Sequence, residues 1–151
     1  MYCYFYKART RRGRTGFTLV ELLVVIVVLA VLAAIVLPKF MNSSRRSREA
    51  ALRSDLKLLR NAINLFQTDT GLYPLNLSAL AATTAPAKGL NSDGTQGDII
   101  AANWHGPYLQ EVPNDPVSSA AFNYGTEAPN VGKVTSSATG NGLDGTPYSS
   151  W

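Results

Sequence analysis

An unbroken apolar run near the N-terminus dominates the pattern of the chain. From Phe17 to Leu37 every residue is apolar except Thr18 and Glu21. As a helix this run is about 30 Å long, which matches the hydrocarbon thickness of a bilayer. The pattern therefore predicts a membrane-spanning helix over residues 17–38. Glu21 is unusual in it, because an acid inside such a helix is costly and tends to mark a function.

The helical pattern continues beyond Pro38 with a different character. Residues 39–70 contain no glycine or proline, and their apolar side chains recur at spacings of four and three, as on one face of a helix. Gly71 and Pro74 predict the end of this helix, and Pro38 is expected to bend or loosen it locally. The apolar stripe consists of Leu52, Leu56, Leu59, Ile63 and Phe66.

The segment that follows the long helix is polar and rich in turn-forming residues. Residues 75–84 fit a short helix capped by Asn76 or Ser78, because their side-chain oxygens can accept from the first free amides. Residues 85–102 are rich in Gly, Ser, Thr, Asn and Asp and predict a loop.

Two short strands are predicted farther along. Residues 121–126 and 131–137 carry β-branched or aromatic side chains between turn formers, and residues 139–151 fit a loop. We therefore expect an α+β fold. In it, one long N-terminal helix, with an apolar transmembrane half and an amphipathic half, packs on a small antiparallel sheet.

Positive charge is concentrated before the apolar run. The chain has 14 Lys and Arg and 10 Asp and Glu, a net charge of +4. Without the leader, nine cations and ten acids remain, so bulk charge gives no support for nucleic-acid binding. Short basic flanks stay on the cytoplasmic side of a membrane, so we expect the C-terminal part in the periplasm. The leader cations are Lys7, Arg9, Arg11, Arg12 and Arg14.

A second basic cluster, Arg45, Arg46 and Arg48, follows the apolar run. One interpretation is a solvated face at the membrane surface. The other is contact with acidic groups of neighbouring molecules.

No residue pattern indicates catalysis. Cys3 is the only cysteine and lies in the leader, and His105 is the only histidine. No serine or cysteine nucleophile has a base at a motif spacing, so we expect no enzyme. Without a cysteine after the leader no disulfide can form there, and the tail must be fixed by other means.

Residues 16–21, Gly-Phe-Thr-Leu-Val-Glu, resemble the N-terminal signal of type IV pilins and type II secretion pseudopilins. In that family a dedicated peptidase cuts after the glycine and methylates the new N-terminus. The resemblance implies cleavage between Gly16 and Phe17 and N-methylation of Phe17. Counted from Phe17, Glu21 is the fifth residue and Pro38 the twenty-second, as is usual in the family. An ordinary signal peptide or signal anchor is the alternative, but it does not account for Glu21.

Motifs in the second half resemble the major pseudopilins of type II secretion. They are Thr70-Gly71-Leu72-Tyr73-Pro74, Trp104-x-Gly106-Pro107-Tyr108-Leu109, Pro113-x-Asp115-Pro116 and the ending from Leu143-Asp144-Gly145 to Trp151. The chain departs from the family at Val117-Ser118, where a tryptophan and a glycine are usual. It departs again near the C-terminus, where the family's acid-rich calcium loop is shortened.

The resemblance implies a structural subunit with residues 1–16 as a removed leader, residues 17–38 as the transmembrane and filament-core helix, and residues 39–151 as a periplasmic pilin-like domain. It implies a single-pass inner-membrane protein that leaves membrane lipid for a homo-oligomeric helical filament, a periplasmic pseudopilus or extracellular filament. The implied partners are the prepilin peptidase, the inner-membrane assembly platform and minor pseudopilins, with no nucleic acid.

Assembly is expected to involve Glu21, Phe17 and Pro38, with Glu21 paired to the amino group of Phe17 on a neighbouring subunit. Two alternatives stay open. One is a type IV pilin for adhesion, twitching or DNA uptake; the other is a signal-anchored periplasmic binding domain that never polymerises.

The residues around Asp144 alone favour a simple turn. The resemblance implies a calcium site there, built from the Asp144 carboxylate and carbonyl oxygens near Leu143. Calcium takes six to eight oxygens, so one carboxylate predicts a weak site. Burial of Tyr148 and Trp151 is expected to offset part of the entropy lost when the tail becomes ordered.

Overall fold

The computed structural model describes residues 16–151, except for the side chains of residues 38–42. The predicted leader before Gly16 lies outside the described residues, and so do the surroundings of the Pro38 side chain. The chain divides into two compact units between Met41 and Asn42. Helix α1, Leu19–Thr70, contributes to both and ends immediately before Gly71, as predicted.

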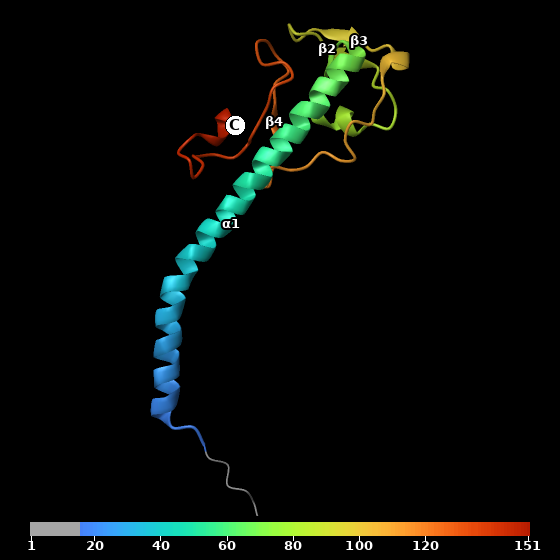
Figure 1. Ribbon diagram of the computed structural model, residues 1–151. Helices are drawn as coiled ribbons and strands as arrows, with labels where there is room; N and C mark the ends of the chain where they lie inside the picture. The colour runs from blue at the N-terminus through green and yellow to red at the C-terminus, as the bar shows by residue number, and fades with distance from the viewer. Residues whose placement is uncertain (1–15) are drawn as a thin grey trace, which may run out of the picture. The chain divides into compact units, whose positions relative to one another are not determined.

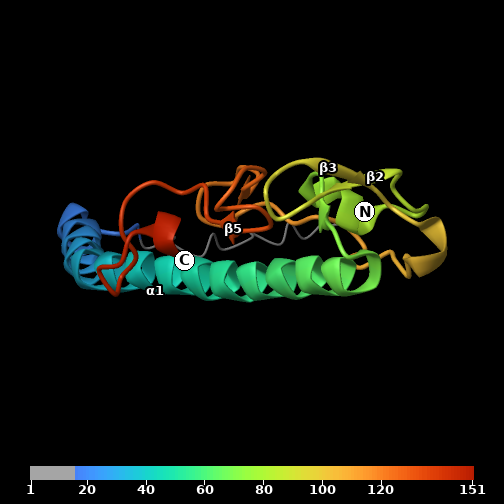
Figure 2. The same cartoon turned by 90° about the horizontal axis from the view of Figure 1, so that it is seen from above.

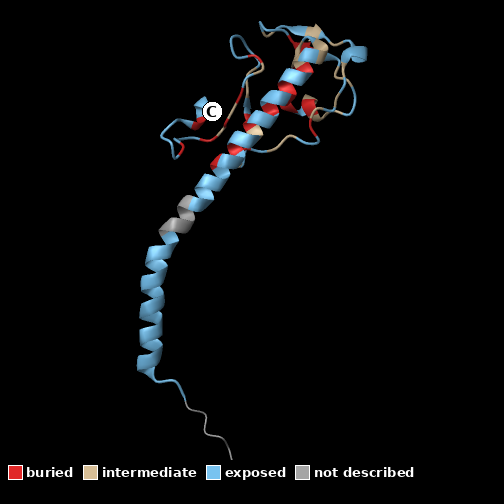
Figure 3. Cartoon of the chain, viewed as in Figure 1, coloured by how far each residue is buried: buried red, intermediate tan, exposed pale blue. Residues whose placement is uncertain are grey.

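The first unit contains the apolar part of α1. Its stretch Leu19–Leu37 is the one helix, among the residues described, that is long and apolar enough to cross a membrane. Figure 3 shows this stretch as exposed throughout. So many exposed apolar side chains are unfavourable in water, so this surface requires lipid or another molecule to cover it.

In the second unit, α1 lies along one side of a layer of short strands and loops (Figures 1 and 2). The predicted apolar stripe is confirmed, since each of its five side chains is at most 2% exposed. These are Leu52, Leu56, Leu59, Ile63 and Phe66. The five side chains pack into one cluster with side chains from segments far along the chain, so the helix organises the core. These partners include Leu77, Leu80, Leu109, Phe122, Val134 and Tyr148.

A three-stranded antiparallel sheet lies at the C-terminal end of α1. It consists of β1 (Tyr73–Pro74), β2 (Lys88–Leu90) and β3 (Gln96–Asp98) in the order β1-β2-β3. The prediction of a loop over residues 85–102 is therefore wrong.

Local polar contacts, rather than alternating apolar residues, define the β2–β3 hairpin. The Asp93 carboxylate accepts from the backbone N–H of Thr95 at 2.9 Å and from its hydroxyl at 2.6 Å. The Asn91 N–H donates to the Thr95 carbonyl. Gly89 lets β2 approach β1, because a Cβ there would lie 2.8 Å from the Tyr73 carbonyl oxygen.

The predicted short helix forms a 3-10 helix, η1 (Leu77–Ala81), which begins after Asn76. The Asn76 side chain caps it by accepting from the Ala79 N–H at 3.1 Å. Two further 3-10 helices are η2 (Ala101–Asn103) and η3 (Tyr148–Ser150).

The two predicted strands are confirmed in place but are shorter. They are β4 (Asn123–Tyr124) and β5 (Val134–Thr135), which pair antiparallel. The Tyr124 hydroxyl donates to the Pro74 carbonyl at 2.7 Å and so connects the two sheets. The fold is α+β, with the helix packed on small antiparallel sheets.

Candidate functional site

The predicted cleavage point, the bond between Gly16 and Phe17, lies in exposed non-helical chain immediately before α1. Such exposed segments are where proteases act most readily. A Cβ added at Gly16 would meet no atom of the described residues within 4 Å. The fold itself therefore does not require glycine at position 16. Any requirement for glycine there must come from a protein that recognises this segment.

Thr18 and Glu21 form a reciprocal cap at the start of α1. The Thr18 hydroxyl oxygen accepts from the Glu21 N–H at 3.2 Å, and the Glu21 carboxylate accepts from the Thr18 N–H at 3.0 Å. This is a capping box, which satisfies two free amides at a helix N-terminus. The structure thus assigns Glu21 a role that the sequence analysis missed, although the Thr-x-x-Glu spacing is its signature.

The cap uses only one of the two carboxylate oxygens. The N–H and the hydroxyl of Thr18 both donate to Oε2 of Glu21. Within the described residues Oε1 has no such bond, so the carboxylate has acceptor capacity for a further donor. The pairing with Phe17 of a neighbouring subunit stays a prediction.

The Trp-x-Gly-Pro-Tyr-Leu motif fastens a long loop to the core. The N–H groups of Tyr108 and Leu109 both donate to the Leu80 carbonyl, and the Tyr108 hydroxyl donates to Asp69 on α1 at 2.7 Å. Gly106 is required because a Cβ would lie 2.4 Å from the Trp104 ring. The motif therefore has a structural role.

Asp115, the acid of the Pro-x-Asp-Pro motif, is fully buried. Its carboxylate accepts from the Val117 N–H at 2.8 Å, from the Ser118 N–H at 3.2 Å, from the Ser137 N–H at 3.1 Å and from the Ser136 hydroxyl. It therefore ties its own turn to the chain leaving β5. Burial raises the pKa of Asp115, but these hydrogen bonds outweigh burial and leave the pKa below its ordinary value.

We expect Asp115→Asn to destabilise the unit Asn42–Trp151 by about 2–4 kcal/mol, because an amide cannot accept from all these donors. Urea unfolding followed by circular dichroism measures this. A carboxyl with a lowered folded-state pKa stabilises above its unfolded pKa, and this stabilisation is lost as the pH falls through the folded pKa. The difference between wild type and variant should therefore shrink in acid. Asp98→Asn, at an exposed carboxyl on β3, is the control, and an equal loss there would contradict the assignment.

The C-terminal segment, residues 139–151, is fastened to α1 by charged side chains. Glu49 is 7% exposed and accepts from the Tyr148 hydroxyl at 2.7 Å and from the Leu143 N–H at 3.0 Å. Arg45 forms an ion pair with Glu49 at 3.2 Å and donates to the Asn141 carbonyl. Arg45 therefore binds its own chain, which neither interpretation of the basic cluster included.

Arg53 and Arg60 continue this attachment along the helix. Arg53 forms an ion pair with Asp144 and lies 4.2 Å from the centre of the Trp151 ring. Arg60 donates to the backbone carbonyls of Val134 and Trp151. The Tyr148 side chain is buried, as expected, and Trp151 is half-buried against it with ring centres 5.1 Å apart.

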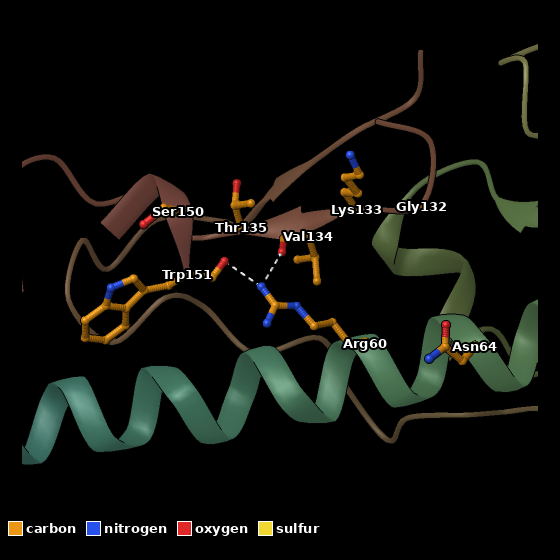
Figure 4. A pocket seen from close by; sticks show the side chains of 8 residues that line it. All are labelled: Arg60, Asn64, Gly132, Lys133, Val134, Thr135, Ser150 and Trp151. Carbon is orange, nitrogen blue, oxygen red and sulfur yellow. Dashed lines mark hydrogen bonds between the residues drawn. The ribbon is translucent and has the colours of Figure 1, made fainter. Parts of the chain in front are cut away.

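A surface hollow lies next to Arg60, but the Arg60 guanidinium is already hydrogen-bonded within the chain and does not face a ligand. Figure 4 shows the guanidinium pointing at the two carbonyls, with both hydrogen bonds drawn. Its remaining lining residues include Lys133, which donates to Asn130 at 3.0 Å. We therefore interpret the hollow as part of the attachment of the tail.

The contacts of Asp144 do not fit the calcium site that the resemblance implies. Asp144 Oδ1 accepts from the N–H and hydroxyl of Thr146, and Oδ2 accepts from Arg53. The hydrogen bonds from Thr146, and to a smaller extent the hydrogen bond and positive charge of Arg53, hold the pKa of Asp144 below its usual value. The part of the chain that the structure describes has no group of three or more His, Cys, Asp or Glu able to hold a metal ion. A single carboxylate already bound to a guanidinium does not fit an ion that takes six to eight oxygens.

Two family descriptions match the chain. "Type II secretion system (T2SS), protein G" matches residues 39–148, and "Prokaryotic N-terminal methylation motif" matches residues 11–37. No solved structure matches.

Curated relatives agree with these family matches. The type II secretion system core protein G of Pseudomonas aeruginosa is 27% identical over 137 residues, which are 87% of this chain and 96% of the relative. That of Vibrio cholerae is 28% identical, over 86% of this chain and 92% of the relative. That of Klebsiella pneumoniae is 33% identical, over 69% of each. Because the first family match covers most of the chain, this protein belongs to the type II secretion system protein G family.

Proposed function

We propose that the protein is a structural subunit of a type II secretion pseudopilus, made as a membrane-anchored precursor and polymerised after processing. The observation that carries the proposal is the arrangement at the N-terminus. An exposed, non-helical Gly16–Phe17 bond lies just before an apolar helix, Leu19–Leu37, whose side chains are all exposed. Lipid before assembly and other copies of the same helix afterwards would both cover this surface.

The proposed topology follows from charge. The cations before Gly16 keep the leader in the cytoplasm, so the apolar helix crosses the inner membrane once and the unit Asn42–Trp151 faces the periplasm. The prepilin peptidase then cuts before Phe17 and methylates its amino group. Assembly would involve the inner-membrane platform and minor pseudopilins.

In the filament, we infer that Glu21 binds the amino group of Phe17 on the adjacent subunit. The capping box leaves Oε1 of Glu21 able to accept, and the cap itself survives cleavage because the Thr18 N–H belongs to the bond with Phe17. A buried charge is tolerated when it is paired, so this contact would fix the register of neighbouring helices.

The relatives favour secretion over a surface pilus. Those compared are named as type II secretion core proteins, and the motifs between residues 104 and 116 resemble those of the major pseudopilins of type II secretion. This supports the secretion pseudopilus rather than a type IV pilin for adhesion, twitching or DNA uptake.

Electron microscopy of cells that overexpress the full-length chain together with a type II assembly platform tests the proposal. We expect filaments that contain the processed chain as their main component. Cells without the platform are the control and should hold the same amount of chain in the membrane, without filaments. A processed, membrane-held chain that stays unassembled with the platform present would contradict the proposal.

A further inference from the structure

The residues that fasten the C-terminal segment lie on one face of α1. Arg45, Glu49, Arg53 and Arg60 are separated by four, four and seven residues, which places them in one row beside the apolar stripe. Each has a partner in residues 139–151. The row is therefore a continuous polar attachment for a segment that has no disulfide.

Arg53 takes part in a closed ring of contacts. Its guanidinium pairs with Asp144 Oδ2, and Asp144 Oδ1 accepts from the Thr146 hydroxyl at 2.6 Å. The Thr146 oxygen in turn accepts from the Trp151 indole N–H at 2.6 Å, and the Trp151 ring faces Arg53 again. A planar guanidinium can bind a carboxylate through its N–H groups while its face lies against an aromatic ring, and Arg53 makes both contacts here.

The turn also has a tight packing constraint at Gly142. A Cβ at this position would lie 2.5 Å from the Trp151 ring and 3.0 Å from Asp144 Oδ1. The indole thus lies directly against the turn, so a ligand shell of six to eight oxygens around Asp144 would require Trp151 and Arg53 to move.

We propose that Arg53 supplies, from within the chain, the positive charge that fixes the Asp144 turn, so that the C-terminal segment folds without calcium. Arg53 is then a positioning residue: it orders the turn through Asp144 and Trp151. This inference concerns the folding of a single subunit and is independent of filament assembly.

Hydrogen exchange of the full-length chain in detergent micelles, read by mass spectrometry, tests the proposal. In the wild type, peptides from residues 139–151 should exchange at the same rate in millimolar calcium and in chelator. Arg53→Gln should speed exchange of these peptides about fivefold, because both the ion pair and the contact with the indole are lost. Peptides from residues 56–66, in the core stripe, should be unchanged.

Matched variants separate this role from a general loss of stability. Arg46→Gln removes an exposed arginine of the same helix that has no hydrogen bond or ion pair within the described residues, and it should exchange like the wild type. Asp144→Asn should resemble Arg53→Gln, and the double variant should be little worse than either single variant, because both remove the same interaction.

Three results would overturn the proposal. The first is a wild-type tail that exchanges at least about fivefold faster in chelator than in calcium. The second is an unchanged tail in Arg53→Gln. The third is faster exchange in Arg53→Gln that is equal in residues 56–66 and residues 139–151, since this would indicate overall destabilisation.

Discussion

Filament assembly is expected to fall at least about tenfold when Glu21 is replaced by glutamine, because a neighbouring amino group then loses its counter-charge in an apolar core. Glutamine keeps the shape of the side chain and can still serve at the N3 position of a capping box. The change therefore removes the charge while α1 keeps its N-terminal cap. The amount of chain in a sheared filament fraction measures the effect.

Two further variants separate the two roles of residue 21. Thr18→Ala removes the capping hydroxyl but keeps the carboxylate, so filaments should persist with a more frayed helix start. Glu21→Ala removes both the cap contact and the charge, and it should insert into the membrane at least as well as the wild type while assembling poorly. Normal filaments from Glu21→Gln would show that the charge pair is dispensable.

Processing is expected to stop when Gly16 is replaced by leucine. The structure leaves open space around Gly16, so the fold should tolerate the side chain and the defect should be confined to recognition by the peptidase. On a denaturing gel the variant should migrate as the full precursor, with membrane levels like those of the wild type and no filaments. Gly13→Leu, the same change three residues earlier, is the control and should be cleaved. Normal cleavage of Gly16→Leu would contradict the assignment of this residue.

The sequence predicted the elements that depend on local pattern. The stripe from Leu52 to Phe66, the end of α1 at Gly71 and the cap at Asn76 are all where periodicity and capping rules place them. These signals do not depend on contacts with distant residues, so a short stretch of sequence is enough to predict the elements.

The β2–β3 hairpin could not be predicted in this way, because each strand has only three residues. Its turn depends on bonds among Asn91, Asp93 and Thr95, and the close pairing of β2 with β1 depends on Gly89. Strands this short show no alternation, and their composition is that of a loop.

The attachment of the tail was missed for a different reason. Arg45 and Asn141 are 96 positions apart, and Arg53 and Asp144 are 91 apart. Nothing in the local pattern of an arginine on a helix distinguishes a solvated side chain from one that binds a distant turn. The only signal in the sequence was the spacing that places Arg45, Glu49 and Arg53 on one helix face. This spacing can be interpreted only when the position of residues 139–151 is known.

We infer that this chain is a pseudopilin precursor that is cleaved before Phe17. Mass spectrometry of the N-terminal peptide of the mature wild-type protein, purified from membranes of cells with a prepilin peptidase, tests it most directly. We expect a chain that begins at Phe17 and carries one methyl group on its amino nitrogen. A mature N-terminus near Ala33, as an ordinary signal peptide would leave, or a chain that keeps its leader in the presence of the peptidase, would contradict it.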